Sequence, residues 1–193
     1  MDVPKLIIVA EHDTCAHTQQ WLERLQLLTN RLQDFPKAML QIRAKTKPEL
    51  RMWAYNQLPK HPRVIINGFV EGEAFPFIHL PQSQAENVTQ PFGMSIHSVQ
   101  DPKQYDSLGP LYYQLGPIFS PISKQGNPQG CSLITQTKRQ THTPIIAVGG
   151  ITPQNTKIVV DAGAYGVASS GFILQASNPI LALQELYAAV NDR

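Results

Sequence analysis

The sequence predicts an α/β fold, a small (β/α)8 TIM barrel whose third and fourth helices are shortened or missing. Two observations lead to this prediction. Eight apolar segments of strand length recur at fairly regular spacing along the 193 residues, and amphipathic segments separate most of them. The last two of these strand segments end in glycine, as expected of loops that bind phosphate at the carboxyl end of such barrels. No repeat or linker interrupts the pattern, so we expect one domain over residues 1–193.

The strand segments are short, and the connections between them differ in length. Strands are predicted at residues 6–10, 39–43, 63–67, 77–80, 92–97, 111–119, 145–148 and 166–170. Helices are predicted at residues 17–34, 48–58, 132–140, 153–162 and 179–191. The connections formed by residues 68–76 and 81–91 are too short for a full helix. We therefore expect the barrel to be trimmed on the side of its third and fourth helices.

Composition excludes several classes of protein. A net charge of +2 without a dense run of lysine and arginine gives no footprint for nucleic acid. Every apolar run has the length of a strand, so no segment is expected to span a membrane, and the first thirteen residues resemble a strand more than a signal peptide. Cys15 and Cys131 lie far apart without metal-binding spacing, which favours a reduced, cytoplasmic setting.

The segment from residue 145 to residue 174 is the most informative part of the chain. A strand there ends in Gly149 and Gly150, a helix follows, and the next strand ends in Gly171. Backbone amides that glycine leaves exposed at two successive strand ends can form an anion-binding site. The alternative is that these glycines only relieve crowding at the strand ends.

Polar residues alternate along two of the other predicted strands. Gln41, Arg43 and Lys45 share one face of the second strand because strand side chains repeat with a period of two. A guanidinium and an ammonium group held together would bind a phosphate or a pyrophosphate, although such charges at a strand end can also be merely solvated. Ser95 and His97 share a face of the fifth strand in the same way.

The loop after the sixth strand is a candidate lid. Residues 120–130 are rich in proline, serine and glycine, and they include Ser123 and Lys124. A loop of this length is long enough to suggest a role in binding substrate, although it can also be a simple connector.

A family resemblance covers nearly the whole chain. The segments QIRAK, VIING, IHLPQ, FGMSIHS, QLGPIFSPISK, IIAVGGITPQN and DAGAYGVASSGFI occur in the order and spacing of thiamine phosphate synthases and the similar TenI-like proteins. This resemblance implies a (β/α)8 barrel. The synthases join a pyrimidine pyrophosphate to a thiazole phosphate with Mg²⁺, whereas the TenI-like thiazole tautomerases move a proton on a thiazole phosphate without metal.

The resemblance also implies two sets of binding residues. Those that correspond to the family's pyrimidine and pyrophosphate site are Gln41, Arg43, Lys45, Asn67 and Lys124, together with Ser95, which matches a serine of the fifth strand. Those that correspond to its thiazole phosphate cradle are Gly149, Gly150, Ser169, Ser170 and Gly171.

The sequence departs from both active sites. The two aspartates that hold Mg²⁺ in the synthases are replaced by Gly68 and Gln84, so we expect no metal site. Pro117 stands where some tautomerases have an acid–base histidine, and the threonine pair of the strand 6 loop is altered to Pro121 and Ser123.

Another residue must therefore supply any proton transfer. His97 is the first candidate, since an imidazole titrates near neutral pH, and His79 and His12 are weaker ones whose orientation the sequence does not fix. A histidine at a barrel end can also be a purely structural, hydrogen-bonded residue. Lys124 is the second candidate catalytic residue, because it could neutralise charge on a departing pyrophosphate.

The sequence thus favours a TenI-like protein of thiamine biosynthesis that binds a thiazole phosphate and catalyses proton transfer. One alternative is a divergent thiamine phosphate synthase, and another is a catalytically silent protein that binds a phosphorylated ligand. The expected partner is a phosphorylated thiazole or a related small molecule, with neither nucleic acid nor membrane, and a homo-oligomer is possible. No cofactor is expected, except Mg²⁺ under the synthase alternative.

Overall fold

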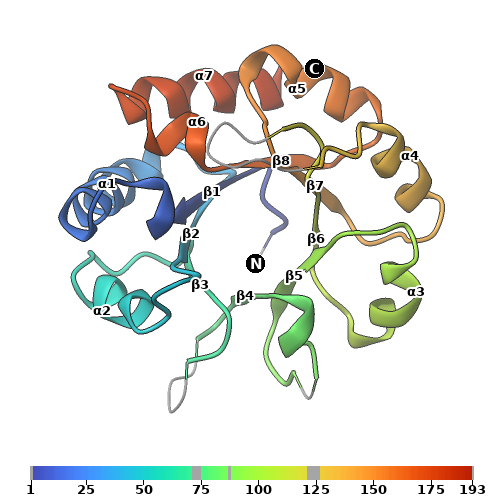
Figure 1. Cartoon of the computed structure of the whole chain (residues 1–193), viewed down its shortest axis with the longest axis horizontal. Helices are drawn as coiled ribbons and strands as arrows, with labels where there is room; N and C mark the ends of the chain where they lie inside the picture. Colours follow the sequence, from blue (N-terminus) through green and yellow to red (C-terminus); the bar gives the residue numbers. More distant parts are fainter. Residues whose placement is uncertain (1, 71–74, 87, 121–126, 193) are drawn as a thin grey trace.

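The chain forms a closed barrel of parallel strands surrounded by helices. The computed structural model describes residues 2–70, 75–86, 88–120 and 127–192. Each strand pairs in parallel with the next along the sequence, and β8 pairs with β1 to close the barrel. Figure 1 shows the barrel from one end, with the helices arranged around the strands. The predicted (β/α)8 fold is confirmed.

The elements follow one another in the expected order. The strands are β1 (Leu6–Glu11), β2 (Ala38–Arg43), β3 (Val64–Asn67), β4 (Ile78–Leu80), β5 (Phe92–Ile96), β6 (Tyr113–Leu115), β7 (Ile145–Val148) and β8 (Gly166–Ser169). The α-helices are α1 (Thr18–Arg31), α2 (Leu50–Asn56), α3 (Asp101–Tyr105), α4 (Ser132–Lys138), α5 (Pro153–Asp161), α6 (Gly171–Leu174) and α7 (Pro179–Asn191). Short 3-10 helices are η1 (His12–Thr14), η2 (Leu32–Asp34), η3 (Gln82–Gln84) and η4 (Asp106–Leu108).

The sixth strand is shorter than predicted. The sequence predicted residues 111–119, whereas β6 comprises Tyr113–Leu115. Pro117 has no amide hydrogen to donate to a neighbouring strand, so the pairing cannot continue through it. Beyond this break, the amides of Ile118 and Phe119 donate to the carbonyls of Val148 and Gly149 at 2.9 Å and 3.1 Å.

The third and fourth connections are reduced, as predicted. In the described residues between β4 and β5, η3 is the only helical turn, and the described residues between β3 and β4 contain no helix. Figure 1 accordingly shows little helical cover outside β4. The five predicted helices are present, whereas α3 and α6 were not predicted. These two helices have five and four residues, which is too short to produce a recognisable helical period.

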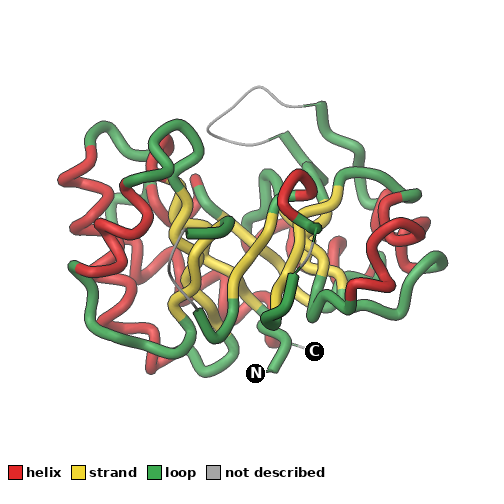
Figure 2. Tube along the Cα trace, turned by 90° about the horizontal axis from the view of Figure 1, so that it is seen from below, coloured by secondary structure: helices red, strands yellow, loops and turns green. Residues whose placement is uncertain are grey.

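The barrel interior changes from apolar to polar along its axis. Successive strand residues point to opposite faces, so one set packs against the helices and the other fills the barrel. The apolar residues of the interior set form one buried cluster, which comprises Ile7, Val9, Met39, Ile65, Phe77, Tyr112, Ile146 and Ala168. The next inward positions toward the carboxyl ends are polar, and they include Gln41, Asn67, Ser95 and Gln114. Figure 2 shows the tilted strands from the side, with helices on either flank.

We predict that Gly93 is required by the packing of the interior. A Cβ atom at Gly93 would overlap the ring of Tyr112, whose hydroxyl end fills that space. Gly93→Ala should therefore lower the free energy of unfolding by about 1–3 kcal/mol in urea denaturation. The cost should largely disappear in a Tyr112→Leu background, because leucine lacks the ring atoms that cause the overlap. Equal costs in the two backgrounds would contradict this explanation.

Candidate active site

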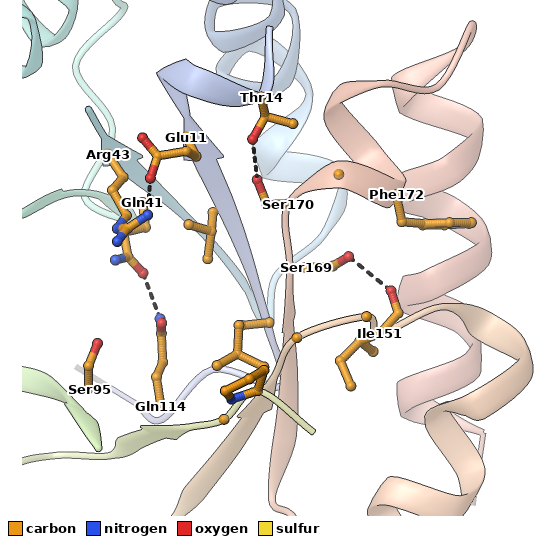
Figure 3. Close-up of a pocket in the computed structure, with 18 of the residues that line it drawn as sticks. Glu11, Thr14, Gln41, Arg43, Ser95, Gln114, Ile151, Ser169, Ser170 and Phe172 are labelled. Carbon is orange, nitrogen blue, oxygen red and sulfur yellow. Dashed lines mark hydrogen bonds and ion pairs between the residues drawn. The ribbon is translucent and has the colours of Figure 1, made fainter. Parts of the chain in front are cut away.

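A cavity of about 360 Å³ opens at the carboxyl ends of the strands. It is lined by most of the residues that the sequence singled out: Gln41, Arg43, Lys45, Asn67, Ser95, His97, Gly149, Gly150, Ser169, Ser170 and Gly171. Residues that the sequence analysis did not assign to the site also line it, notably Glu11, Thr14, Gln114, Ile151 and Phe172 (Figure 3). Ser123 and Lys124 lie outside the described residues. The structure thus brings residues from seven of the eight strands and their loops to one place.

An ion pair between Glu11 and Arg43 occupies one wall of the cavity. The Arg43 guanidinium donates to Glu11 Oε2, and the amide of Lys45 donates to Glu11 Oε1 at 3.1 Å. Only 3% of the Glu11 side chain is exposed, against 31% of the Arg43 side chain. The buried carboxylate therefore depends on these two donors to compensate the loss of hydration of its charge. Burial lowers the pKa of Arg43. The predicted cationic face therefore carries its own counter-ion, which offsets part of its charge.

A row of amide side chains crosses the floor of the cavity. Gln114 donates through Nε2 to Gln41 Oε1 at 2.6 Å, and Gln41 donates in turn to Asn67 Oδ1 at 2.7 Å. Figure 3 shows the first of these bonds. Gln41 and Gln114 are buried, so the two bonds fix the orientation of both amides. Asn67, which lines the cavity, keeps its Nδ2 group as a donor.

The three candidate histidines have different surroundings. His97 lines the cavity, and its Nδ1 lies 2.9 Å from the carbonyl oxygen of Gly116. Since a carbonyl only accepts, Nδ1 carries a proton and donates it to this carbonyl. His12 bonds to Thr18 at 2.9 Å and packs edge-on against Trp21, and it is not among the residues that line the cavity.

His79 lies deeper than the other two histidines. Its side chain is fully buried between Ser95, 2.8 Å from Nε2, and the hydroxyl of Tyr112, 3.3 Å from Nδ1. Burial, with a smaller effect of the Arg43 charge, lowers the pKa of His79 to about 3. The imidazole is therefore neutral near neutral pH. It reaches the cavity only through the hydroxyl of Ser95.

The loops after β7 and β8 meet on the opposite side of the cavity. Gly149 and Gly150 line the cavity and have φ angles of 100° and 60°, a conformation that favours glycine. The hydroxyl of Ser169 donates to the carbonyl of Ile151 at 3.0 Å, which ties the two loops together. A Cβ at Gly149 would also lie 2.7 Å from Cβ of Pro117. Crowding is therefore one reason for this glycine, and it does not conflict with an anion-binding role.

The residues at the expected metal position do not fit a divalent cation. Gly68 offers no side chain, and Oε1 of Gln84 already accepts from the amide of Phe69 at 3.0 Å. The Arg51 guanidinium lies beside them and donates to the carbonyl of Asn67. Among the described residues, no three histidine, cysteine, aspartate or glutamate side chains are grouped as metal ligands. Hard cations such as Mg²⁺ prefer anionic oxygen ligands, which this position lacks.

Comparison with known proteins identifies the family. The family model described as thiamine monophosphate synthase matches residues 78–173, which include β4 to β8 and the two glycine loops. This match and the relatives below support the thiamine phosphate synthase/TenI-like superfamily for this chain. The resemblance noted in the sequence is therefore confirmed at the level of the superfamily.

Curated relatives point in the same direction. A thiamine-phosphate synthase of Anoxybacillus flavithermus is 35% identical over 101 residues, which cover 51% of this chain and 46% of the relative. One of Bacillus velezensis is 38% identical over 90 residues, covering 45% of this chain and 40% of the relative. The chain thus matches less than half the length of these relatives. Their names favour the synthase alternative over the tautomerase interpretation that the sequence analysis preferred.

Solved structures share the fold over almost the whole chain. Thiamine phosphate pyrophosphorylase from Pyrococcus furiosus superposes with a TM-score of 0.69 at 15% identity, covering 97% of this chain and 96% of that structure. The Amycolatopsis orientalis BexX/CysO complex gives a TM-score of 0.69 at 13% identity, with 98% and 93% covered. At these identities the superpositions support the barrel fold alone.

The lengths and hydrophobicity of the helices bear on whether any of them could span a membrane. None of the helices in the described part of the chain combines the length and hydrophobicity of a membrane-spanning segment.

We predict that Arg43 is needed both for stability and for anion binding. Arg43→Ala leaves the buried Glu11 carboxylate without its counter-ion, and should lower the free energy of unfolding by about 2–4 kcal/mol. The double variant Arg43→Ala with Glu11→Gln should regain most of this stability. Both variants should bind inorganic pyrophosphate more weakly than the parent, because both lack the guanidinium.

Urea denaturation and calorimetric titration measure the two effects. Arg31→Ala is the matched control, because its ion pair with Asp34 is exposed and contributes little to stability. Parental stability and pyrophosphate affinity in Arg43→Ala would show that the guanidinium is only a solvated surface charge.

Proposed function

We propose that this protein binds a thiazole phosphate, with the phosphate group in the loops after β7 and β8. The observation that carries this proposal is the convergence on one cavity of the two glycine loops and the polar side chains of β2, β3 and β5. The left-handed turn at Gly149–Gly150 supports a phosphate position, since successive amides there can converge on an anion. The thiazole ring would then extend toward Gln41 and Ser95.

The reaction that we propose first is the condensation of this thiazole phosphate with a pyrimidine pyrophosphate. The names of the curated relatives support it. The ring nitrogen of the thiazole would attack the methylene carbon of the pyrimidine. A C–N bond would form, the C–O bond would break, and pyrophosphate would leave with the electron pair. Arg43 and Lys45 lie where they could bind the pyrophosphate oxygens. Lys124 would add a third cation from the strand 6 loop.

The metal used by synthases of this family does not fit the residues present. Gly68 and Gln84 supply no carboxylate, and the guanidinium of Arg51 stands next to them. Neutralisation of the departing pyrophosphate would therefore rest on side-chain cations of this chain. Arg43 is already paired with Glu11, and side-chain cations do not coordinate the leaving oxygens directly as Mg²⁺ does. We therefore expect a slow condensation.

Proton transfer on the thiazole phosphate is a second candidate reaction. The geometry of His97 favours it, because Nδ1 donates to the Gly116 carbonyl and leaves Nε2 available as a base at the cavity rim. This arrangement differs from the histidine that tautomerases carry directly after the strand 6 glycine, where this chain has Pro117. A protein that binds the thiazole phosphate without either reaction is the remaining alternative.

We predict that phosphate binding will be observed at the backbone. Titration with inorganic phosphate, and then with thiazole phosphate, should shift the NMR signals of the amides of Gly149, Gly150, Ser170 and Gly171. The signal of Gly109, which lies in a turn after η4, is the control and should not move. Shifts confined to β2 and the amide of Lys45 would contradict the proposed phosphate position.

We predict that condensation will be slow and nearly independent of added Mg²⁺. Product analysis after incubation with the pyrimidine pyrophosphate and each thiazole phosphate tautomer, with and without Mg²⁺, measures this and detects tautomerisation as well. Gly68→Asp with Gln84→Asp should raise the rate and make it depend on Mg²⁺. If the parent protein formed thiamine phosphate at a rate on the order of 1 s⁻¹ or faster, that result would contradict the prediction.

The matched control for this variant is Gly68→Asn with Gln84→Asn. Gly68 has a φ angle of 84°, and a Cβ there would lie 2.5 Å from the Arg51 guanidinium, so both variants must displace that side chain. Asparagine imposes the same strain as aspartate but brings no charge. A difference between the two variants therefore reports the carboxylates alone.

A further inference from the structure

A buried chain of hydrogen bonds reaches the cavity through β4. The imidazole of His79 separates two hydroxyl groups: that of Tyr112, 3.3 Å from Nδ1, and that of Ser95, 2.8 Å from Nε2. Both His79 and Tyr112 are fully buried, and their rings stack with their centroids 5.8 Å apart. Gly93 leaves the space that the Tyr112 ring fills. Only Ser95 at the end of this chain lines the cavity.

The direction of the chain follows from the proton of Tyr112. The Tyr112 hydroxyl is fully buried, and its oxygen lies 3.3 Å from Nδ1 of His79. Nδ1 of His79 is therefore positioned to accept the Tyr112 proton. Leaving this proton without an acceptor in the core would be unfavourable.

A neutral imidazole that accepts at Nδ1 carries its proton at Nε2. His79 then donates to Ser95 Oγ, and the hydroxyl proton of Ser95 is left to point elsewhere. Burial and the Arg43 charge lower the pKa of His79 to about 3, so the imidazole keeps one charge state at neutral pH. The direction of the chain is therefore constant over the range in which the protein would act.

We propose that Tyr112 and His79 are positioning residues that fix the Ser95 hydroxyl as a hydrogen-bond donor toward the bound ligand. On the same wall, Asn67 Oδ1 already accepts from Gln41, which leaves the Asn67 amide as a second donor. With Arg43 and Lys45 beside them, this wall presents donors to the ligand. It selects the anionic oxygens of a pyrophosphate group. This proposal rests on the cavity being the binding site of the proposed function.

The tautomer of His79 can be tested directly. In ¹⁵N-histidine-labelled protein, the NMR signals of His79 should show a protonated Nε2 and an unprotonated Nδ1 in the neutral range. Tyr112→Phe keeps the ring against Gly93 but removes the donor to Nδ1, and should mix the two tautomers. A protonated Nδ1 in the parent would overturn the proposal, because the Ser95 proton would then point at His79.

The consequence for binding is tested with inorganic pyrophosphate by calorimetry. Ser95→Ala should weaken binding about tenfold, since a hydrogen bond to a charged oxygen is lost. Tyr112→Phe should weaken it by about threefold, because the donor direction is then only partly kept. In the Ser95→Ala background, Tyr112→Phe should have no further effect.

A merely structural role for Tyr112 predicts a different result. It would give the same loss with and without Ser95, and that outcome would overturn the proposal. Inorganic phosphate gives an independent measurement, since it reports the Gly149–Gly150 loops. If phosphate shifts no amide there while the His79 tautomer is as expected, the proposed function fails and the hydrogen-bond direction stands.

Discussion

Polar side chains inside a closed barrel must find partners within it or in a ligand, and this constraint organises the carboxyl half of the protein. Several inward polar side chains are held by a polar side chain from a different strand. Glu11 of β1 pairs with Arg43 of β2, and Gln41 lies between Gln114 and Asn67. Such mutual bonding removes the cost of burying unpaired polar groups and sets donors and acceptors before a ligand arrives. The cavity wall is thus organised in advance for binding.

The Glu11–Arg43 pair also bears on which ligands the cavity favours. A buried carboxylate next to the guanidinium offsets part of the positive charge that a pyrophosphate would need. The glycine loops bear no such opposing charge: their donors are backbone amides, and a phosphate there needs no side-chain cation. A phosphate at the β7–β8 side is therefore easier to accommodate than a pyrophosphate at the β2 side. This asymmetry agrees with a thiazole phosphate as the first ligand and with a slow condensation.

Much of this site could be predicted from the sequence, because strand periodicity alone places Gln41, Arg43 and Lys45 on one face. The period does not say which residue of a neighbouring strand stands opposite. Glu11 meets Arg43 only through the register of β1 against β2, so the ion pair was missed. A charged residue directly after the apolar run LIIVA was the signal available for it. The partners of His79 depend on the pairing of three strands, which no local pattern encodes.

Arg51 links the trimmed side of the barrel to the loss of the metal ligands. No long helix supports the β3–β4 side in the described residues, and Arg51 donates from α2 to the carbonyl oxygens of Pro48, Asn67 and Phe69. These bonds hold the turn that contains Gly68 to the neighbouring helix. A carboxylate at position 68 or 84 would attract the same guanidinium and compete with the carbonyls for its donors. The neutral residues Gly68 and Gln84 thus leave the hydrogen bonds of Arg51 to these carbonyls undisturbed. Two aspartates at these positions would leave them undisturbed only if a metal ion bound the carboxylates.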